Sequence, residues 1–508
     1  MKHYIIAASM LAMATSAMAQ ETYESAQIAT EDLNGTARYV GMGGAMEALG
    51  ADISTISTNP AGLGMFRRSW AGMSFSLSSI PQQENLPNTS KTVMGFDQIG
   101  FVVATRTGEN SYLNFAANYH KSRNFNQILP AIGALTEASI NKHSYIGALN
   151  DYTASQIDVL MDKTVLVDPY DKDRYYLDAT NYEFRREQKG YIGEYDISIS
   201  GNHKDRIYWG IAAGLHDVHY KGETEYEERV VDSDGPAGTL YLNDLREITG
   251  TGFDIKAGVI IRPIEYSPFR IGVSISTPTW YTLTSANDAY VMNNTPYGQS
   301  DRYGCTESNK YRMDTPWKFG LSLGHTISNV FAIGASYEYA DYSSIDNRII
   351  TDEYYDPYYG TTEVDSESDR LMNRNTERCL DGVHTLKVGA EYKLTPEIAV
   401  RAGYNYVSPM YKKTGFRDMS LNCDGVYYAS TTDYTNWKDT QRLTLGLGYS
   451  SHGFSLDLAY VLNTQDGEFH PFPNTSYSEA GETIRNVASG VNVKNERHQF
   501  MMTLGYRF

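Results

Sequence analysis

The chain has 508 residues, 43 Lys and Arg against 61 Asp and Glu, and a formal net charge of −18 at pH 7. Such an acidic chain is a poor partner for nucleic acid, which is itself a polyanion. Its mean hydropathy of −0.44 does not exclude a membrane β-barrel, because only alternate residues of a barrel strand face lipid. Tyr is abundant, at 41 residues, and its ring with a polar tip suits the headgroup level of a membrane.

The first nineteen residues have the pattern of a secretory signal peptide. A short positive start at 1–3 precedes a mainly apolar run at 4–14, and Ala17-Met-Ala19 forms a small-residue cleavage motif. We therefore expect cleavage before Gln20 and export of residues 20–508. The apolar run is too short to span a bilayer, and no later window supplies the roughly 20 predominantly apolar residues of a transmembrane helix.

Residues 20–69 precede the first predicted strand and carry a conspicuous motif. A Gly-rich stretch at 37–45 is followed by Asp52-Ile-Ser54, and then by five residues in a row: Asn59, Pro60, Ala61, Gly62 and Leu63. Because proline fixes φ and lacks an N–H, the motif predicts a compact turn in which the Asn59 side chain bonds neighbouring backbone. The turn either anchors the segment or lies against a gap in a surrounding wall.

From residue 70 onward, segments of about ten residues alternate apolar with small or polar side chains, which is typical of transmembrane β-strands. Ile211, Ala213 and Leu215, for example, alternate with Ala212 and Gly214. The predicted strands lie near 70–80, 98–103, 113–120, 191–201, 209–216, 253–261, 269–275, 317–324, 333–339, 386–392, 398–404, 442–449, 454–460 and 500–508. This count of about fourteen is even, as in bacterial single-chain barrels.

The connections between these strands alternate in length. Six are tight turns, at 107–110, 203–205, 263–266, 328–329, 395–397 and 451–453. The others are mostly longer and rich in Tyr, Asp, Asn and Gly. Short turns on one side and long loops on the other predict a periplasmic and an extracellular end, and an even strand count places both termini in the periplasm.

The connection at about 126–186 is too long for a plain hairpin, and we expect a partly helical extracellular loop. Its first apolar stripe has approximately helical spacing, and a second short stripe follows. Together they supply the candidate residues of an apolar patch that collects a greasy ligand: Ile128, Ile132, Leu135, Ile157, Leu160 and Met161. The alternative is an unstructured surface loop.

Several predicted strands place charges on the inward face. Five cations are candidates to receive a ligand carboxylate by charge-assisted hydrogen bonding: Lys256, Arg270, Lys318, Arg401 and Arg442. Acidic residues also face inward, so these cations alternatively form a pairing network that anchors residues 20–69. His216 also faces inward, and we interpret it as a polar lumen residue rather than a haem ligand. The sequence contains none of the CxxC, HExxH or EF-hand spacings, so it predicts no metal site and no cofactor.

The chain ends in a strand whose outward residues are all apolar. Phe500, Met502 and Leu504 lead to Tyr506 and to Phe508, the final residue. An amphipathic terminal strand that closes on an aromatic residue resembles the C-terminal signature of bacterial outer-membrane barrels. We therefore assign Tyr506 and Phe508 to the signal for barrel assembly rather than to ligand binding.

The motif and the architecture together resemble the FadL/TodX family of outer-membrane channels for hydrophobic compounds. In that family a Gly-rich stretch is followed by an Asp-x-Ser segment, matched here by 52–54, and by Asn-Pro-Ala-Gly-Leu, matched by 59–63. The resemblance implies that residues 20–69 are a plug, or hatch, inside a barrel of residues 70–508. It also implies a lateral exit near the plug, with 114–118 on a counterpart of the kinked strand of the family. Bacteroidetes chains of this type are often described as hemin receptors.

The sequence thus predicts an all-β protein: a transmembrane antiparallel β-barrel of about fourteen strands with an N-terminal plug, in the outer membrane. The expected function is passive uptake of hydrophobic small molecules, with long-chain fatty acids the leading class, and no enzymatic activity. The alternatives are a barrel that holds a partner protein or serves a secretion system, and a haem-uptake protein. Expected partners are the ligand, lipid and lipopolysaccharide of the outer membrane and the barrel-assembly machinery, and we expect a monomer.

Overall fold

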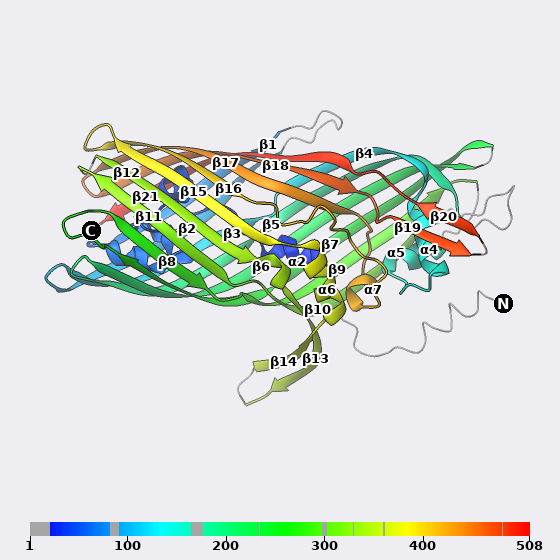
Figure 1. Cartoon of the computed structure of the whole chain (residues 1–508), viewed down its shortest axis with the longest axis horizontal. Helices are drawn as coiled ribbons and strands as arrows, with labels where there is room; N and C mark the ends of the chain where they lie inside the picture. Colours follow the sequence, from blue (N-terminus) through cyan, green and yellow to red (C-terminus); the bar gives the residue numbers. More distant parts are fainter. Residues whose placement is uncertain are drawn as a thin grey trace.

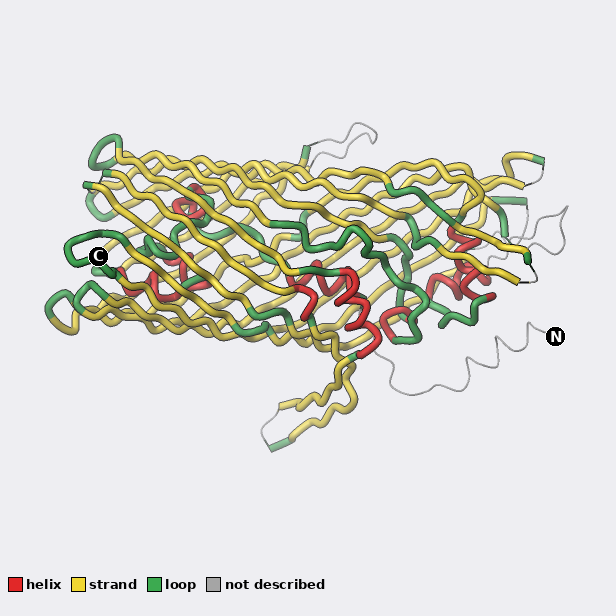
Figure 2. The backbone as a smooth tube through the Cα atoms, viewed as in Figure 1, coloured by secondary structure: helices red, strands yellow, loops and turns green. Residues whose placement is uncertain are grey.

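The computed structural model describes residues 21–81, 91–163, 176–232, 234–296, 302–328, 330–358, 361–479 and 481–508. The predicted signal peptide, 1–19, lies outside these residues. Most of the described chain is β-strand, and the strands run obliquely along the longest axis of the molecule (Figures 1 and 2). None of the helices in the described ranges is long and apolar enough to cross a membrane.

Fourteen of the described strands form a closed antiparallel ring, in which each strand pairs with the next and the last pairs with the first. In ring order they are β1 (Trp70–Ile80), β2 (Lys91–Gly108), β3 (Ser111–Asn124), β5 (Asp178–His203), β6 (Ile207–Asp232), β7 (Gly235–Ile261), β8 (Arg270–Ser276), β11 (Lys318–Ile327), β12 (Phe331–Asp341), β15 (Gly382–Lys393), β16 (Ile398–Val407), β17 (Tyr434–Ser451), β18 (Phe454–His470) and β21 (Val491–Arg507). The prediction of about fourteen barrel strands is confirmed.

A belt of exposed apolar side chains encircles the ring. On β6 the belt consists of Ile207, Trp209, Ile211 and Leu215, whereas the exposed residues further along the strand are charged or polar. A membrane strand needs only about 9–11 residues to cross the hydrocarbon core, and β6 has 26. The long strands β5, β6 and β7 therefore continue well beyond the belt and form a wall outside the membrane.

Further strands complete this outer wall. β4 (Gln127–Ala138) pairs with β5, while β9 (Trp280–Asn294) pairs with both β7 and β10 (Tyr303–Asp314). Thr-Pro dipeptides separate β8 from β9 at Pro278, and β10 from β11 at Pro316. Proline cannot donate to a ladder, so each dipeptide interrupts the pairing at the same level of the wall.

The remaining elements lie at the end of the barrel opposite the tight turns and the C-terminus, or along its flank (Figure 1). They are α4 (Ile140–Leu149), α5 (Gln156–Lys163), η3 (Tyr342–Ser344), β13 (Asp346–Asp356), β14 (Thr361–Ser368), α6 (Arg370–Cys379), α7 (Asp424–Tyr427), β19 (Thr475–Glu479) and β20 (Glu482–Asn486). The hairpin of β13 and β14 projects away from the barrel wall.

The expectation of helical spacing around 128–135 is wrong. Ile128, Ile132 and Leu135 belong to β4, whose residues from Gln127 to Ala134 pair continuously with β5. Because β5 extends far beyond the membrane belt, it offers an unpaired edge there, and strand pairing outweighs the helical spacing. The second predicted stripe is helical, since residues 157–161 lie in α5.

Residues 21–69 lie inside the ring, where the dark-blue elements of Figure 1 are enclosed by the strands. They form α2 (Thr22–Ala29), α3 (Ala37–Gly41) and two short 3₁₀ helices, η1 (Ile53–Ser57) and η2 (Pro60–Met65). Asp52 ties the segment together, because its carboxylate accepts hydrogen bonds from the Ser54 N–H and from the Thr36 hydroxyl.

The inner face of the wall carries glycine wherever this N-terminal segment approaches most closely. An added Cβ would meet N-terminal-segment atoms at about van der Waals contact or closer at nine positions, on nine of the fourteen ring strands: Gly100, Gly210, Gly258, Gly272, Gly324, Gly334, Gly389, Gly403 and Gly446. At Gly334 and Gly389 the obstacles are the backbone carbonyls of Ala45 and Met42. We call these nine residues the glycine seat. They explain why glycine recurs at inward strand positions.

Candidate functional site: the lumen cavity and its charges

A cavity of about 290 Å³ lies between the N-terminal segment and the inner wall. Its lining contains more charged and polar side chains than apolar ones. The residues just after α2 form one side of the cavity, and the opposite side comes from strands far apart in sequence, including β3, β5, β16, β17 and β21. The barrel closure is what brings these strands together.

Three guanidinium groups converge on one carboxylate in this cavity. Asp32 lies 3.3 Å from Arg123 Nη1, 3.5 Å from Arg497 Nη2 and 3.6 Å from Arg442 Nη2, and it accepts a hydrogen bond from the Asn124 N–H. Burial alone would raise the pKa of Asp32, but the three guanidiniums hold it well below its usual range. We call Arg123, Arg442 and Arg497 the arginine triad. Together with Asp32 it has an excess of two positive charges.

The same cavity is also lined by aromatic rings. Tyr23 of α2 stacks on Tyr411 with ring centroids 5.1 Å apart, and Phe125 meets Tyr220 edge-to-face at 5.2 Å. Met410 also lines the cavity and packs on a buried apolar cluster. The cavity therefore offers cations for an anionic group and rings for an apolar or aromatic body.

The structure places the five predicted lumen cations in different roles. Arg442 belongs to the arginine triad, and Lys318 pairs with Glu31 of the N-terminal segment. Arg401 lies between Glu391 and Asp457, at 2.6 and 2.7 Å.

The Arg401 cluster also holds the N-terminal segment, because Arg38 donates two hydrogen bonds to Glu391 at 3.0 and 3.1 Å. Arg270 donates to the Leu49 carbonyl at 2.9 Å. The contacts of Lys318, Arg270 and Arg401 therefore agree with the anchoring interpretation. Sequence reasoning missed a further pair of this kind, Lys387 with Glu47 at 2.9 Å, because it could not tell which segment faces each strand.

The motif at 59–63 is wedged against the wall. The Asn59 side chain accepts from the Ala61 N–H at 3.1 Å and donates to the Val273 carbonyl of β8 at 3.4 Å. Asn114 of β3 donates to the Leu63 and Phe66 carbonyls, at 2.6 and 3.1 Å. This is the compact turn that the sequence predicts, with wall contacts on both sides.

No break occurs in the described pairing of β3 at the level of this motif. β3 pairs with β2 from Ser111 to His120, and with β5 from Tyr112 to Lys121. The lateral exit implied by the family resemblance near 114–118 is therefore closed in this conformation.

The six candidate capture residues do not form an exposed patch. Five are buried, and Ile132 alone is exposed among them. Leu135, Ile157, Leu160 and Met161 pack into one cluster with aromatic residues of the outer wall such as Phe469. In this conformation most of them belong to the core of the cap, the group of elements at the barrel end opposite the tight turns, and not to its surface.

The terminal strand closes the barrel. β21 pairs with β1 from Trp70 opposite Arg507, and the Phe508 N–H donates to the Ser69 carbonyl. Tyr506 and Phe508 are exposed on the apolar belt, as the alternation predicts. Their role as an assembly signal stays a prediction.

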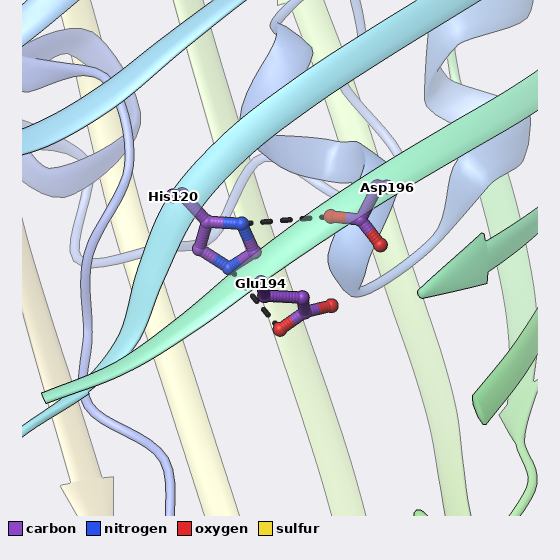
Figure 3. A group of neighbouring side chains, drawn as sticks. All are labelled: His120, Glu194 and Asp196. Carbon is purple, nitrogen blue, oxygen red and sulfur yellow. Dashed lines mark ion pairs between the residues drawn. The ribbon is translucent and has the colours of Figure 1, made fainter. Parts of the chain in front are cut away.

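A buried cluster of histidines and carboxylates was not anticipated. His120 of β3 lies against Glu194 and Asp196 of β5 (Figure 3), and His216 of β6 lies 3.2 Å from Asp254 of β7. Only Glu194 and Asp196 are close in sequence, and the other residues of the cluster lie on separate strands. No short sequence motif therefore marks the cluster. Only the register of four adjacent strands could have revealed it.

The comparisons with known proteins match this architecture. A family model described as "Outer membrane protein transport protein (OMPP1/FadL/TodX)" matches residues 270–420. The structure of a Pseudomonas aeruginosa FadL homologue covers 94% of this chain and 99% of its own, with 15% identity and a TM-score of 0.55. The matched stretch and the barrel fold are thus similar to those of FadL/TodX-type outer-membrane transport proteins.

Two further solved structures resemble this chain. The Pseudomonas putida toluene transporter TodX has 12% identity, a TM-score of 0.47 and coverage of 94% of this chain and 99% of its own. The CymD monoaromatic hydrocarbon channel has 11% identity, a TM-score of 0.48 and coverage of 94% and 98%. No curated protein matches the sequence. The matched family model describes transport proteins, which agrees with the prediction that the chain is not an enzyme.

Proposed function

We propose that this protein is a channel for passive uptake of hydrophobic small molecules that carry an acidic head group, with long-chain fatty acids the leading class. The observation that supports this proposal is the arginine triad, which has two positive charges in excess of Asp32 and lines a cavity that also contains aromatic rings. A carboxylate would bind the triad through charge-assisted hydrogen bonds. The apolar body of the same ligand would lie along Tyr23, Phe125 and Tyr411.

The charge of this cavity favours an acid over a neutral hydrocarbon. Toluene, the compound that names the TodX transporter, has no group that could satisfy a guanidinium. A neutral ligand would remove water from the triad without replacing its hydrogen bonds, which costs free energy. A fatty acid supplies the missing acceptors, so it fits this cavity better than a monoaromatic hydrocarbon does.

In this proposal residues 20–69 act as the plug, and both termini face the periplasm. Release of the ligand then requires the plug to shift. Such a shift would have to break the ion pairs that join Arg38 to Glu391, Glu47 to Lys387 and Glu31 to Lys318, of which the pair of Glu47 with Lys387 is buried. Because breaking a buried pair is expensive, we expect slow release from the resting state.

The proposal can be tested by binding of oleate and its methyl ester to the purified barrel. We expect oleate to bind at micromolar concentration and the ester, which lacks the charge, to bind more weakly. The double variant Arg442→Gln/Arg497→Gln should weaken oleate binding by roughly 10–150-fold, the equivalent of one charged hydrogen bond, and leave the ester unchanged. Arg378→Gln, at an exposed pair with Asp418 outside the cavity, is the matched control.

Two results would overturn the proposal. One is the absence of oleate binding at micromolar concentration. The other is equal binding of acid and ester that the double variant does not change, which would indicate a neutral hydrocarbon as the ligand.

A further inference from the structure

The buried cluster of the inner wall contains two imidazoles, three carboxylates and one ammonium group. His120, Glu194, Asp196, His216, Asp254 and Lys256 are all at most 6% exposed. They lie on four adjacent strands, β3, β5, β6 and β7, and contact one another inside the barrel. Figure 3 shows three of them, His120, Glu194 and Asp196. His120 also lines the cavity described above, so the cluster is reached from the lumen.

The charges of this cluster do not balance. With neutral imidazoles, three carboxylates face one ammonium group, which leaves two negative charges in excess. An uncompensated buried charge is expensive, and proteins avoid it by pairing the charge or by binding a metal. One divalent cation would neutralise this excess completely.

Lys256 contacts only one oxygen of each carboxylate. Its ammonium group contacts Glu194 Oε1, lies 3.2 Å from Asp196 Oδ1 and lies 3.0 Å from Asp254 Oδ1. The second oxygen of each carboxylate faces a histidine instead. Lys256 therefore neutralises one oxygen of each carboxylate, and the other oxygen remains available to a ligand.

The distances on the histidine side suit a shared metal ion. Glu194 Oε2 lies 3.5 Å from His120 Nε2 and 4.0 Å from His216 Nδ1, and Asp254 Oδ2 lies 3.2 Å from His216 Nε2. Ligands at 2.0–2.1 Å from a tetrahedral Zn²⁺ are separated by roughly 3.3 Å. Within each of two triads, His120 with Glu194 and Asp196 and Glu194 with His216 and Asp254, the ligand atoms lie within 4.8 Å of one another.

Asp196 provides a buried carboxylate oxygen that is available to a metal ion. Asp196 Oδ2 is fully enclosed, accepts no hydrogen bond among the described residues, and faces His120 Nδ1 at 3.5 Å.

Neighbouring hydroxyl groups orient the residues of the second triad. The Tyr281 hydroxyl lies 3.3 Å from His216 Nδ1, and the Thr279 hydroxyl donates to Asp254 at 3.4 Å. Such supporting contacts are typical of metal sites.

We propose that this cluster binds one divalent transition-metal ion of the Zn²⁺ class through imidazole nitrogens and carboxylate oxygens. Glu194 is shared by the two triads, and Lys256 is the permanent cation behind the carboxylates. Through the shared Glu194 the ion ties β5 to neighbouring strands on the inner wall. Mixed imidazole and carboxylate ligands suit Zn²⁺ and exclude a preference for Ca²⁺ or Mg²⁺, which favour oxygen alone.

The test uses the full-length barrel in detergent, stripped with a chelator and titrated with Zn²⁺ by calorimetry. We expect saturation at a single ion per chain. Glu194→Gln and His216→Ala should each weaken binding at least as much as the roughly 10–100-fold that loss of a supporting partner costs. His219→Ala is the matched control, since His219 pairs with Asp217 on the outer face of the same strand.

X-ray absorption at the zinc edge of the wild-type protein gives a readout that does not depend on any variant. It should show imidazole nitrogen together with carboxylate oxygen around the ion. Failure to bind Zn²⁺ at micromolar concentration overturns the proposal, as does binding that His219→Ala abolishes or a zinc spectrum without imidazole. Retained heat-modifiable mobility of each variant on gels shows that its barrel has folded.

Discussion

At the scale of single residues, the lumen contains two charged clusters, one with an excess of positive charge and one with an excess of negative charge. The arginine triad has one carboxylate for three guanidiniums, whereas the histidine cluster has one ammonium for three carboxylates. Neither imbalance follows from the net charge of the chain, which is spread mainly over loops and strand ends. Each imbalance is the basis of one proposal above, an acid at the arginine triad and a divalent cation at the histidine cluster.

Lys256 is the only permanent cation in the cluster that it forms with His120, Glu194, Asp196, His216 and Asp254, which we call the histidine cluster. In metal-free protein, Lys256→Met leaves three buried carboxylates without a cation, and we expect the free energy of unfolding to fall by about 3–5 kcal/mol. Urea unfolding in detergent micelles measures this change. Lys310→Met, which removes a partly exposed pair with Glu353, should cost less than about 1 kcal/mol. Equal losses in the two variants would show that the Lys256 contacts contribute little.

At the scale of elements, the glycine seat lets the N-terminal segment lie directly on the strands. Gly389→Ala places a Cβ within 3.0 Å of the Met42 carbonyl, and because the obstacle is backbone, the segment must move. We expect faster proteolysis within residues 37–49 while the barrel itself stays folded. Gly108→Ala, whose added Cβ meets only ordinary contacts at 3.7 Å or more, should behave as wild type. Unchanged proteolysis in Gly389→Ala would contradict a tightly seated segment.

The docking of α4 at the barrel end opposite the tight turns should depend on pH through Glu228. This carboxylate lies on β6 beyond the apolar belt, where it accepts hydrogen bonds from the Ile140 N–H at the start of α4 and from the Tyr226 hydroxyl. Burial raises the pKa of Glu228 to about 7 from an ordinary 4.5. The folded state therefore binds this proton more tightly, and stability falls as pH rises from about 4.5 to about 7, by no more than about 3 kcal/mol.

Hydrogen exchange of residues 140–149, corrected for the intrinsic pH dependence, measures this effect. In the wild type, the protection of these amides should decrease between pH 5 and pH 8. In Glu228→Gln, their protection should not depend on pH over this range. His143, whose pKa burial lowers, and the pair of Lys142 with Asp178 remain in both proteins, so their contributions cancel. Glu227→Gln, at an exposed position on the same strand, is the control. A wild type equally protected at both pH values would refute the role of Glu228.

At the scale of the whole molecule, strand alternation was sufficient to predict the ring but not its contents. All fourteen predicted strands lie in the closed barrel, because a membrane wall imposes the same period of two on every strand. The triad and the histidine cluster could not be predicted, since each joins residues far apart in sequence whose neighbourhood is set by strand register. The β4 segment was mispredicted for a related reason: its partner strand extends beyond the membrane, and local spacing gave no sign of that extension.

The final prediction concerns the N-terminal segment as the stopper of the barrel. About eight strands can fill a barrel with their own side chains, so fourteen leave a lumen that another segment must close. Deletion of residues 21–69, with the predicted signal peptide retained, should leave a barrel that inserts into membranes and keeps its heat-modifiable mobility. Wall charges such as Glu391, Lys387 and Lys318 lose their partners, but water entering the lumen solvates them. In planar bilayers the deleted protein should form a large, stable, ion-conducting pore, whereas the intact protein should conduct little. If the intact protein conducts as well as the deleted one, residues 21–69 do not close the barrel.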